Sequence, residues 1–181
     1  VAGGQGLFVV AGQVPAGTDF GDGKPVGTSG DTDAFVAAFD PATGALRWKA
    51  ALGGDDGGYD GEAVYGLATD RWQQVVAVGD YRKPFSVGGN VIATPPTIPS
   101  TNPPIPARCF FGVKFDATGA PVWVKSFTST VLASGRSAAA RVDGSFVVSG
   151  VMNGANIDLG AGTKVSTGTG NQDMFTIGWT P

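Results

Sequence analysis

Apolar residues alternate with other residues along several short segments of this chain, in the two-residue period of a β-strand. In the clearest segment, the side chains that share one strand face are Cys109, Phe111, Val113 and Phe115. Similar short segments precede and follow it, and turn residues separate them. We therefore predict strands over residues 62–69, 74–81, 109–115 and 121–127.

Two short links between predicted strands have the residues of hairpin turns. One is Asp116-Ala-Thr-Gly119, and residues 40–44 (Asp-Pro-Ala-Thr-Gly) repeat it with one extra residue. An aspartate can accept hydrogen bonds from nearby backbone N–H groups, and a glycine can adopt positive φ. The four predicted strands therefore form a small antiparallel sheet. Asp19 and Asp158 recur in the same way, and we predict turn roles for them too.

The same pattern of strands and turns occurs three times. Residues 7–12 match residues 75–79 and 146–150, at spacings of 67 and 71 residues between their glycines. An aromatic phrase follows each copy and starts at Phe35, Phe111 and Phe175. Self-similarity over such a long period is typical of a repeat protein.

These units predict an all-β fold built from blades of a β-propeller, each a four-stranded antiparallel sheet. Stacked blades would bury the recurring Phe and Trp side chains between them. We expect a partial blade with strands two to four, a complete blade, and a partial blade with strands one to three, over residues 1–52, 53–127 and 128–181. Propellers close with about four to eight blades, so three units cannot close one. We therefore expect these units to be part of a longer polypeptide or of a multi-chain propeller.

The order of motifs in the first unit resembles the bacterial β-propeller repeats often called SBBP repeats. Val-Val-x-Gly is followed by Asp19–Gly23 (Asp-Phe-Gly-Asp-Gly), Asp33–Asp40, Gly-x-x-x-Trp and Leu52–Gly54. The resemblance covers most of the chain and implies a propeller of about seven blades, within the usual range. It also implies an extracellular or cell-envelope location. It implies no shared catalytic residues and no shared ligand.

Composition and charge exclude several classes of protein. The net charge is −3, and the twelve Lys and Arg residues are scattered, whereas nucleic-acid binders concentrate basic residues. No apolar run approaches the roughly 20 residues of a membrane-spanning helix. Because the chain has no histidine, it cannot form a Ser-His-Asp or Cys-His arrangement. We expect the single cysteine, Cys109, to be a small buried apolar side chain.

One Gly-rich loop holds the candidate metal ligands Asp55, Asp56, Asp60 and Glu62. Carboxylate oxygens on a flexible backbone suit Ca²⁺, although the spacing differs from an EF-hand loop. The alternative is a solvated loop whose aspartates accept backbone hydrogen bonds. We predict no other cofactor.

Residues 94–106 hold six of the twelve prolines and lie between two predicted strands of the second unit. We expect this insertion to adopt extended polyproline geometry and to project from the blade. It is either a recognition loop, an oligomer contact or a tolerated surface insertion.

The sequence predicts a non-catalytic binding or scaffold module, used in adhesion or assembly on a secreted or cell-surface protein. Its partner would be a protein or a glycan. One alternative is a subunit of an extracellular filament or multi-chain assembly, in which edge strands pair between chains. Another is the propeller portion of a larger secreted hydrolase.

Overall fold

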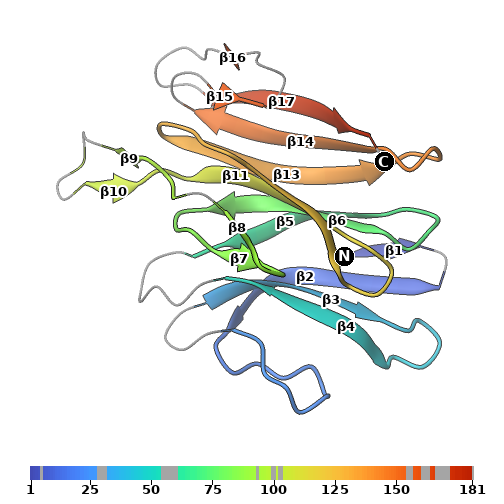
Figure 1. Ribbon diagram of the computed structural model, residues 1–181. Coiled ribbons are helices and arrows are strands. Elements are labelled where there is room, and N and C mark those ends of the chain that lie inside the picture. Colours follow the sequence, from blue (N-terminus) through green and yellow to red (C-terminus); the bar gives the residue numbers. More distant parts are fainter. Residues whose placement is uncertain are drawn as a thin grey trace.

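The chain folds into antiparallel β-sheets, and the described residues contain no helix (Figure 1). The structure, a computed structural model, describes residues 1–4, 6–27, 32–53, 61–92, 94–98, 101, 104–153, 157–159, 164–165 and 172–180. The all-β antiparallel class predicted from the sequence is therefore confirmed.

Three larger sheets follow one another along the chain and lie face over face in Figure 1, from sheet 1 (blue to cyan) through sheet 2 (green to yellow) to sheet 3 (orange to red). Sheet 1 has the order β1-β2-β3-β4, with strands Ala2–Gly4, Leu7–Pro15, Thr32–Phe39 and Leu46–Leu52.

Sheet 2 contains the four strands that the apolar pattern predicted. It has the order β12-β11-β6-β5, and the strands in chain order are β5 (Ala63–Thr69), β6 (Val75–Tyr81), β11 (Cys109–Phe115) and β12 (Pro121–Phe127). Each bound lies within one residue of its prediction. Sheet 3 has the order β13-β14-β17, with strands Leu132–Ala140, Phe146–Asn153 and Gln172–Trp179.

The strand count of sheet 1 differs from the prediction. We expected three strands over residues 1–52, and the structure adds a short fourth one, β1, which pairs with β2 from Ala2 opposite Val9 to Gly4 opposite Leu7. The Ala-Gly-Gly sequence of β1 has no apolar alternation. It joins the sheet through backbone pairing, which side-chain patterns do not reveal.

Three two-stranded hairpins were not expected. In the first, β7 (Ser86–Val87) pairs with β8 (Asn90–Val91). In the second, β9 (Thr97–Ile98) pairs with β10 (Ile105–Pro106), and in the third, β15 (Ile157–Asp158) pairs with β16 (Lys164–Val165). The hairpin of β9 and β10 lies in the proline-rich insertion, so its described ends pair as strands instead of forming the expected polyproline segment. Figure 1 shows it projecting from sheet 2.

The register of the sheets places the repeat positions opposite one another. Phe35 pairs with Gly12, Phe111 with Gly79, and Phe175 with Gly150. These pairs define which positions match in the three sheets. The front face of each sheet is the face of Phe35, Phe111 or Phe175, and the back face is the opposite one.

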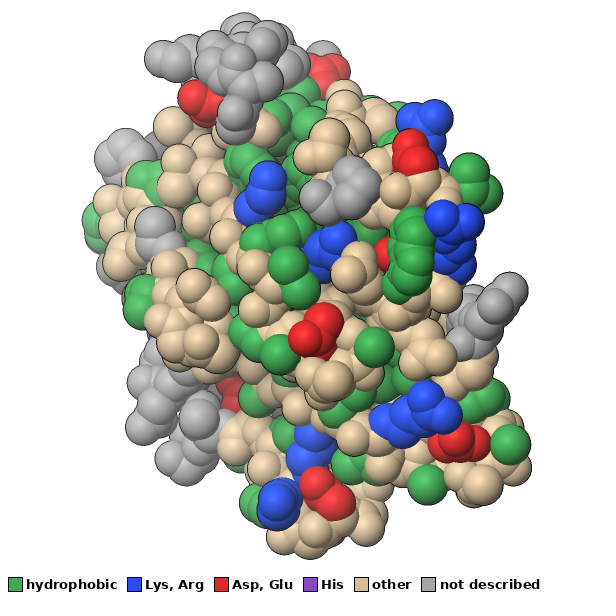
Figure 2. All heavy atoms as spheres, turned by 45° about the vertical axis from the view of Figure 1, so that its right-hand side comes forward, with side chains coloured by type: hydrophobic (Ala, Val, Ile, Leu, Met, Phe, Trp, Pro, Cys, Tyr) green, Lys and Arg blue, Asp and Glu red, His purple; other side chains and the backbone are tan. Residues whose placement is uncertain are grey.

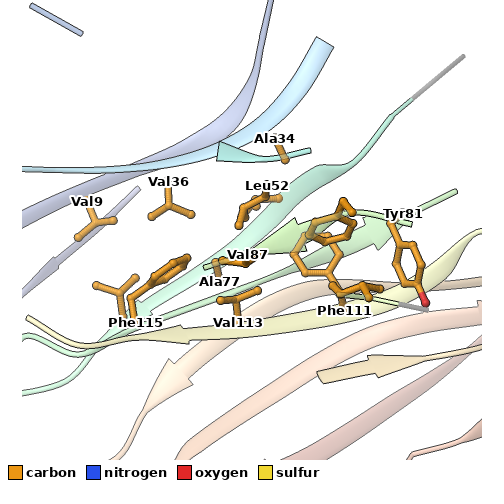
Figure 3. Close-up of a cluster of buried hydrophobic side chains, with 14 of the residues drawn as sticks. Val9, Ala34, Val36, Leu52, Ala77, Tyr81, Val87, Phe111, Val113 and Phe115 are labelled. Carbon is orange, nitrogen blue, oxygen red and sulfur yellow. The ribbon is translucent and has the colours of Figure 1, made fainter. Parts of the chain in front are cut away.

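The front face of sheet 2 packs on the back face of sheet 1. Figure 3 shows Val36 and Leu52 of sheet 1 facing Val113 and Phe115 of sheet 2, and all four are fully buried. The ring centroid of Trp48 in β4 lies 5.5 Å from that of Phe115. A tightly packed layer of large apolar side chains therefore joins the two sheets.

The front face of sheet 3 packs on the back face of sheet 2 through the matching positions. Trp123 and Trp179 repeat the pair formed by Trp48 and Phe115, with ring centroids 4.8 Å apart. Phe110 from the back face of sheet 2 stacks on Trp179 at 6.0 Å. The molecule thus forms one kind of sheet-to-sheet interface twice, with matching aromatic positions.

Candidate functional site

The front face of sheet 1 carries an apolar groove of about 550 Å³. β2 and β3 form its floor, and the turn after β3 forms its rim. Six of the described residues line this groove: Phe8, Val10, Phe39, Asp40, Pro41 and Gly44. Exposed apolar grooves of this kind often mark sites where a protein or a ligand binds.

The three strand residues of the groove, Phe8, Val10 and Phe39, occupy positions that the other two sheets bury. Phe8 pairs with Phe39 in sheet 1, as Val75 pairs with Phe115 in sheet 2. Phe8 is 41% exposed, whereas Val75 is completely buried. Its counterpart in sheet 3, Phe146, is completely buried as well. Among the described residues, no sheet lies over these positions of sheet 1, whereas a sheet covers the matching positions of sheets 2 and 3. The groove is open for this reason.

A loop over part of the front face shows the same contrast. Phe20 lies in the loop between β2 and β3, and its ring centroid is 4.9 Å from that of Phe35. In sheet 2 the loop residue Phe85 lies 5.2 Å from Phe111 in the same way. Phe85 is buried but Phe20 is only half-buried. The ring of Phe20 also lies 6.4 Å from that of Phe39, so the loop covers one end of the front face of sheet 1 and reaches the edge of the groove. Phe8 stays exposed.

The rim turn is held by Asp40. Its Oδ1 accepts hydrogen bonds from the backbone N–H groups of Ala42 and Thr43, at 2.9 and 3.1 Å. Its Oδ2 accepts one from Arg47 Nη2 at 2.7 Å. Gly44 closes the turn with a φ of 72°. The predicted turn chemistry is confirmed here and at Asp116, which accepts the N–H groups of Thr118 and Ala120.

The charged rim is neutralised within the chain. The hydrogen bond from the Arg47 guanidinium, followed by those from the backbone N–H groups of Ala42 and Thr43, lowers the pKa of Asp40 to about 2. Asp40 is therefore ionised at neutral pH and already paired. A ligand of the groove would meet an apolar floor and no unpaired charge at this turn.

Two aspartates, Asp19 and Asp22, hold the loop beside the groove in place. Asp19 accepts hydrogen bonds from the backbone N–H groups of Gly21, Asp22 and Gly23, so its predicted turn role is confirmed. Lys49 in β4 pairs with the Asp22 carboxylate. These contacts fix the loop against sheet 1 and preserve the shape of the groove edge.

The face turned toward the viewer in Figure 2 mixes Lys and Arg with Asp and Glu side chains, and apolar patches lie between them.

An exposed pair of side chains comes from the first strands of sheets 2 and 3. Tyr65 and Arg136 occupy matching β-bulges, and the Arg136 guanidinium carbon lies 4.4 Å from the centroid of the Tyr65 ring. The Tyr65–Arg136 pair is the second surface feature available for contact.

Cys109 lies in the closed interface between sheets 1 and 2 and not on the surface. It is completely buried, and its Sγ accepts a hydrogen bond from the Ser129 N–H at 3.3 Å. Burial is the main cause that raises the pKa of Cys109, so the thiol form is favoured. The prediction of a small buried apolar side chain is confirmed. Burial likewise raises the pKa of the neighbouring Tyr81 to about 12.

The candidate calcium ligands Asp55, Asp56 and Asp60 lie outside the described residues. Glu62 is described: it is buried directly before β5, and its backbone carbonyl accepts a hydrogen bond from Gln13 Nε2 at 3.0 Å. Among the residues that the structure describes, no three Asp, Glu, Cys or His side chains gather as a metal site would require. The calcium site stays a prediction.

Sequence reasoning did not select the groove residues as a site. Its signal is present in residues 7–11 (Leu-Phe-Val-Val-Ala), where both strand faces are apolar. A strand that is apolar on both faces is usually buried on both faces. The back-face residues Leu7 and Val9 are buried, and the front-face residues Phe8 and Val10 are left at the groove.

No protein-family model matches the chain, and no curated protein sequence is significantly similar to it. Within the described residues, the structure contains no helix of the length and apolar character that a membrane span requires.

Proposed function

We propose that this chain is a non-catalytic binding and scaffold module of an extracellular or cell-surface protein, and that its sheets are blades of a β-propeller. The main support is the repetition of one sheet-to-sheet interface, in which the pair Trp48–Phe115 recurs as Trp123–Trp179. Units that pack through matching faces are typical of repeat architectures. The resemblance to SBBP repeats supports the location.

The groove on sheet 1 is the binding surface in this proposal. It offers exposed aromatic area from Phe8 over a floor held rigid by β2 and β3. Aromatic side chains in a rigid groove bind apolar side chains of a protein, or the apolar face of a sugar ring. The partner is therefore a protein or a glycan that presents an apolar face.

The binding role is tested by screening the purified chain against a glycan array and a panel of purified extracellular proteins. A specific partner that is lost in Phe8→Ser and kept in Val91→Ser, an exposed position outside the groove, supports the proposal. Binding to neither collection removes the binding role and leaves a structural one.

The propeller arrangement has its own test. Electron micrographs of the native protein should show a disc with a central channel, because propeller blades are arranged radially. An elongated stack of sheets without a channel would reject the propeller and leave the stacked scaffold.

A further inference from the structure

We propose that the groove on sheet 1 is covered by a second copy of this chain, which docks the back face of its sheet 3 there. This inference rests on the proposed scaffold role and names the partner. The closed interfaces show what covers a front face, since a back face does so twice within the chain. In the part of the chain that the structure describes, no sheet covers the front face of sheet 1 or the back face of sheet 3.

The exposed back face of sheet 3 has the positions that form the closed interfaces in the other sheets. Met174 matches Phe110 of sheet 2 and Ala34 of sheet 1, because each directly precedes the paired Phe of its strand. Phe110 and Ala34 are completely buried, whereas Met174 is 79% exposed. A large apolar side chain so far exposed is a feature of a contact surface.

The closed interface predicts where Met174 would lie. Phe110 contacts two rings of the sheet above it, with centroid distances of 5.2 Å to Phe175 and 6.0 Å to Trp179. The matching rings on sheet 1 are Phe35 and Phe39. Phe20 of the loop after β2 packs on both of these rings, with its ring centroid 4.9 Å from that of Phe35 and 6.4 Å from that of Phe39. Met174 of a second copy therefore meets this aromatic cluster at the edge of the groove, and a flexible methionine fits such a surface well.

Charge favours the same pairing. The described positions of β14 and β17 on this back face include no charged residue: they are Val147, Ser149, Val151, Asn153, Gln172, Met174, Thr176 and Gly178. On the groove side, Asp40 is paired with Arg47. Docking thus buries no unpaired charge from β14, β17 or the Asp40 turn, and an unpaired charge would oppose burial.

The contact joins two different faces, so it is head-to-tail. Each copy offers one groove and one back face, and copies therefore either close into a ring or extend into a filament. A head-to-tail contact makes a specific prediction for mixed variants, because a defect in one face leaves the other face intact.

The experiment measures sedimentation velocity of the full chain up to about 100 µM, where an association with a Kd of about 10 µM is mostly complete. We expect the mass of the wild-type chain to rise with concentration. Phe8→Asp and Met174→Asp each weaken the association at least about tenfold, because each places a charge in an apolar contact. Val91→Asp, at an exposed position outside both faces, is the matched control and associates as the wild type does.

An equimolar mixture of Phe8→Asp and Met174→Asp distinguishes the proposal from other self-association. The first variant keeps its back face and the second keeps its groove, so the mixture forms a complex of one copy of each. Circular dichroism confirms that both variants fold, and Met174→Asp changes only an exposed side chain. Because the back face is uncharged, raising NaCl from about 0.1 to about 0.5 M changes the affinity less than twofold.

Three results would overturn the inference: a wild-type chain that stays monomeric over the whole range, a Phe8→Asp or Met174→Asp variant that associates normally, or a mixture that forms no complex. A monomeric chain that still binds a glycan or another protein at the groove would reject the second copy as occupant and keep the proposed function. Self-association without any such partner would keep the inference and restrict the function to assembly.

Discussion

Phe115 and Phe39 occupy matching positions in neighbouring sheets and differ in what lies over them. Phe115 is completely buried beneath sheet 1, with Trp48 against its ring. Phe39 has no sheet over it among the described residues and is only half-buried at the groove. The two residues have the same chemistry and the same place in their strands. The difference teaches that the burial of a phenylalanine at this position depends on whether another sheet packs on its face, and it is the reason for proposing the groove as a contact surface.

The largest expected effect separates these two phenylalanines directly. Phe115→Ala removes a completely buried ring from the closed interface and should lower the free energy of unfolding by about 4 kcal/mol. Phe39→Ala removes a half-buried ring and should lower it by about 1–2 kcal/mol. Urea unfolding of the two variants measures both values. Equal losses would mean that the front face of sheet 1 is as well covered as that of sheet 2.

A smaller effect is expected at the matching glycines. A Cβ atom at Gly79 would collide with the backbone carbonyl oxygen of Ala63 in β5, so we expect Gly79→Ala to lower the free energy of unfolding by about 3 kcal/mol. At Gly12 the nearest atom to such a Cβ is a ring carbon of Phe35 at 3.6 Å, an ordinary contact.

The control is Gly12→Ala, which should be neutral or stabilise the chain by about 0.5 kcal/mol. The reason for the difference is the short β1, whose pairing reaches only Val9 and stops before Gly12. Thermal unfolding of both variants checks the pair. A large loss of stability in Gly12→Ala would contradict this explanation, because it would show that β1 pairs with β2 beyond Val9.

The smallest effect concerns the turns at the open and the closed face. The pKa of Asp40 is lowered from 3.8 to about 2, first by Arg47, so its contacts stabilise the folded chain above pH 4 and this contribution is lost as the pH falls toward 2. We expect Asp40→Asn to be less stable than the wild type at pH 7, and the difference to shrink as the pH falls through this range. Urea unfolding at several pH values measures it.

Asp116 provides the matched control for this turn. Its pKa is also lowered, but the first cause is the hydrogen bond from Thr118 and not an arginine. Arg47→Gln should therefore raise the pKa of Asp40 toward 3.8 and leave that of Asp116 unchanged, as followed by carboxyl resonances in NMR titrations. A common shift of both would contradict the separate origins that the structure assigns.

Local patterns were sufficient to predict the all-β antiparallel class and the strands of sheet 2. The alternation of apolar residues predicted β5, β6, β11 and β12 within one residue, because a strand in a covered sheet needs apolar side chains at fixed intervals. The Asp–Gly turns were predictable because Asp40 and Asp116 accept hydrogen bonds from backbone N–H groups two to four residues away. The burial of Cys109 followed from its place in an apolar strand.

Other features could not be read from local patterns. The strand β1 is Ala-Gly-Gly and depends on backbone pairing alone. The hairpin of β9 and β10 forms in a proline-rich segment whose composition favours extended chain. The groove was missed because residues 7–11 are apolar on both faces, and a strand's own sequence does not say which neighbour covers which face.

The amino-acid sequence by itself determined the longer strands, the Asp–Gly turns and the repeated aromatic positions, because these depend on side-chain period and on bonds between near neighbours. Only the tertiary structure decided that Phe115 is buried and Phe39 is open, since burial depends on which sheet lies against which. The same apolar strand face is core where another sheet packs on it and a groove where none of the described residues does.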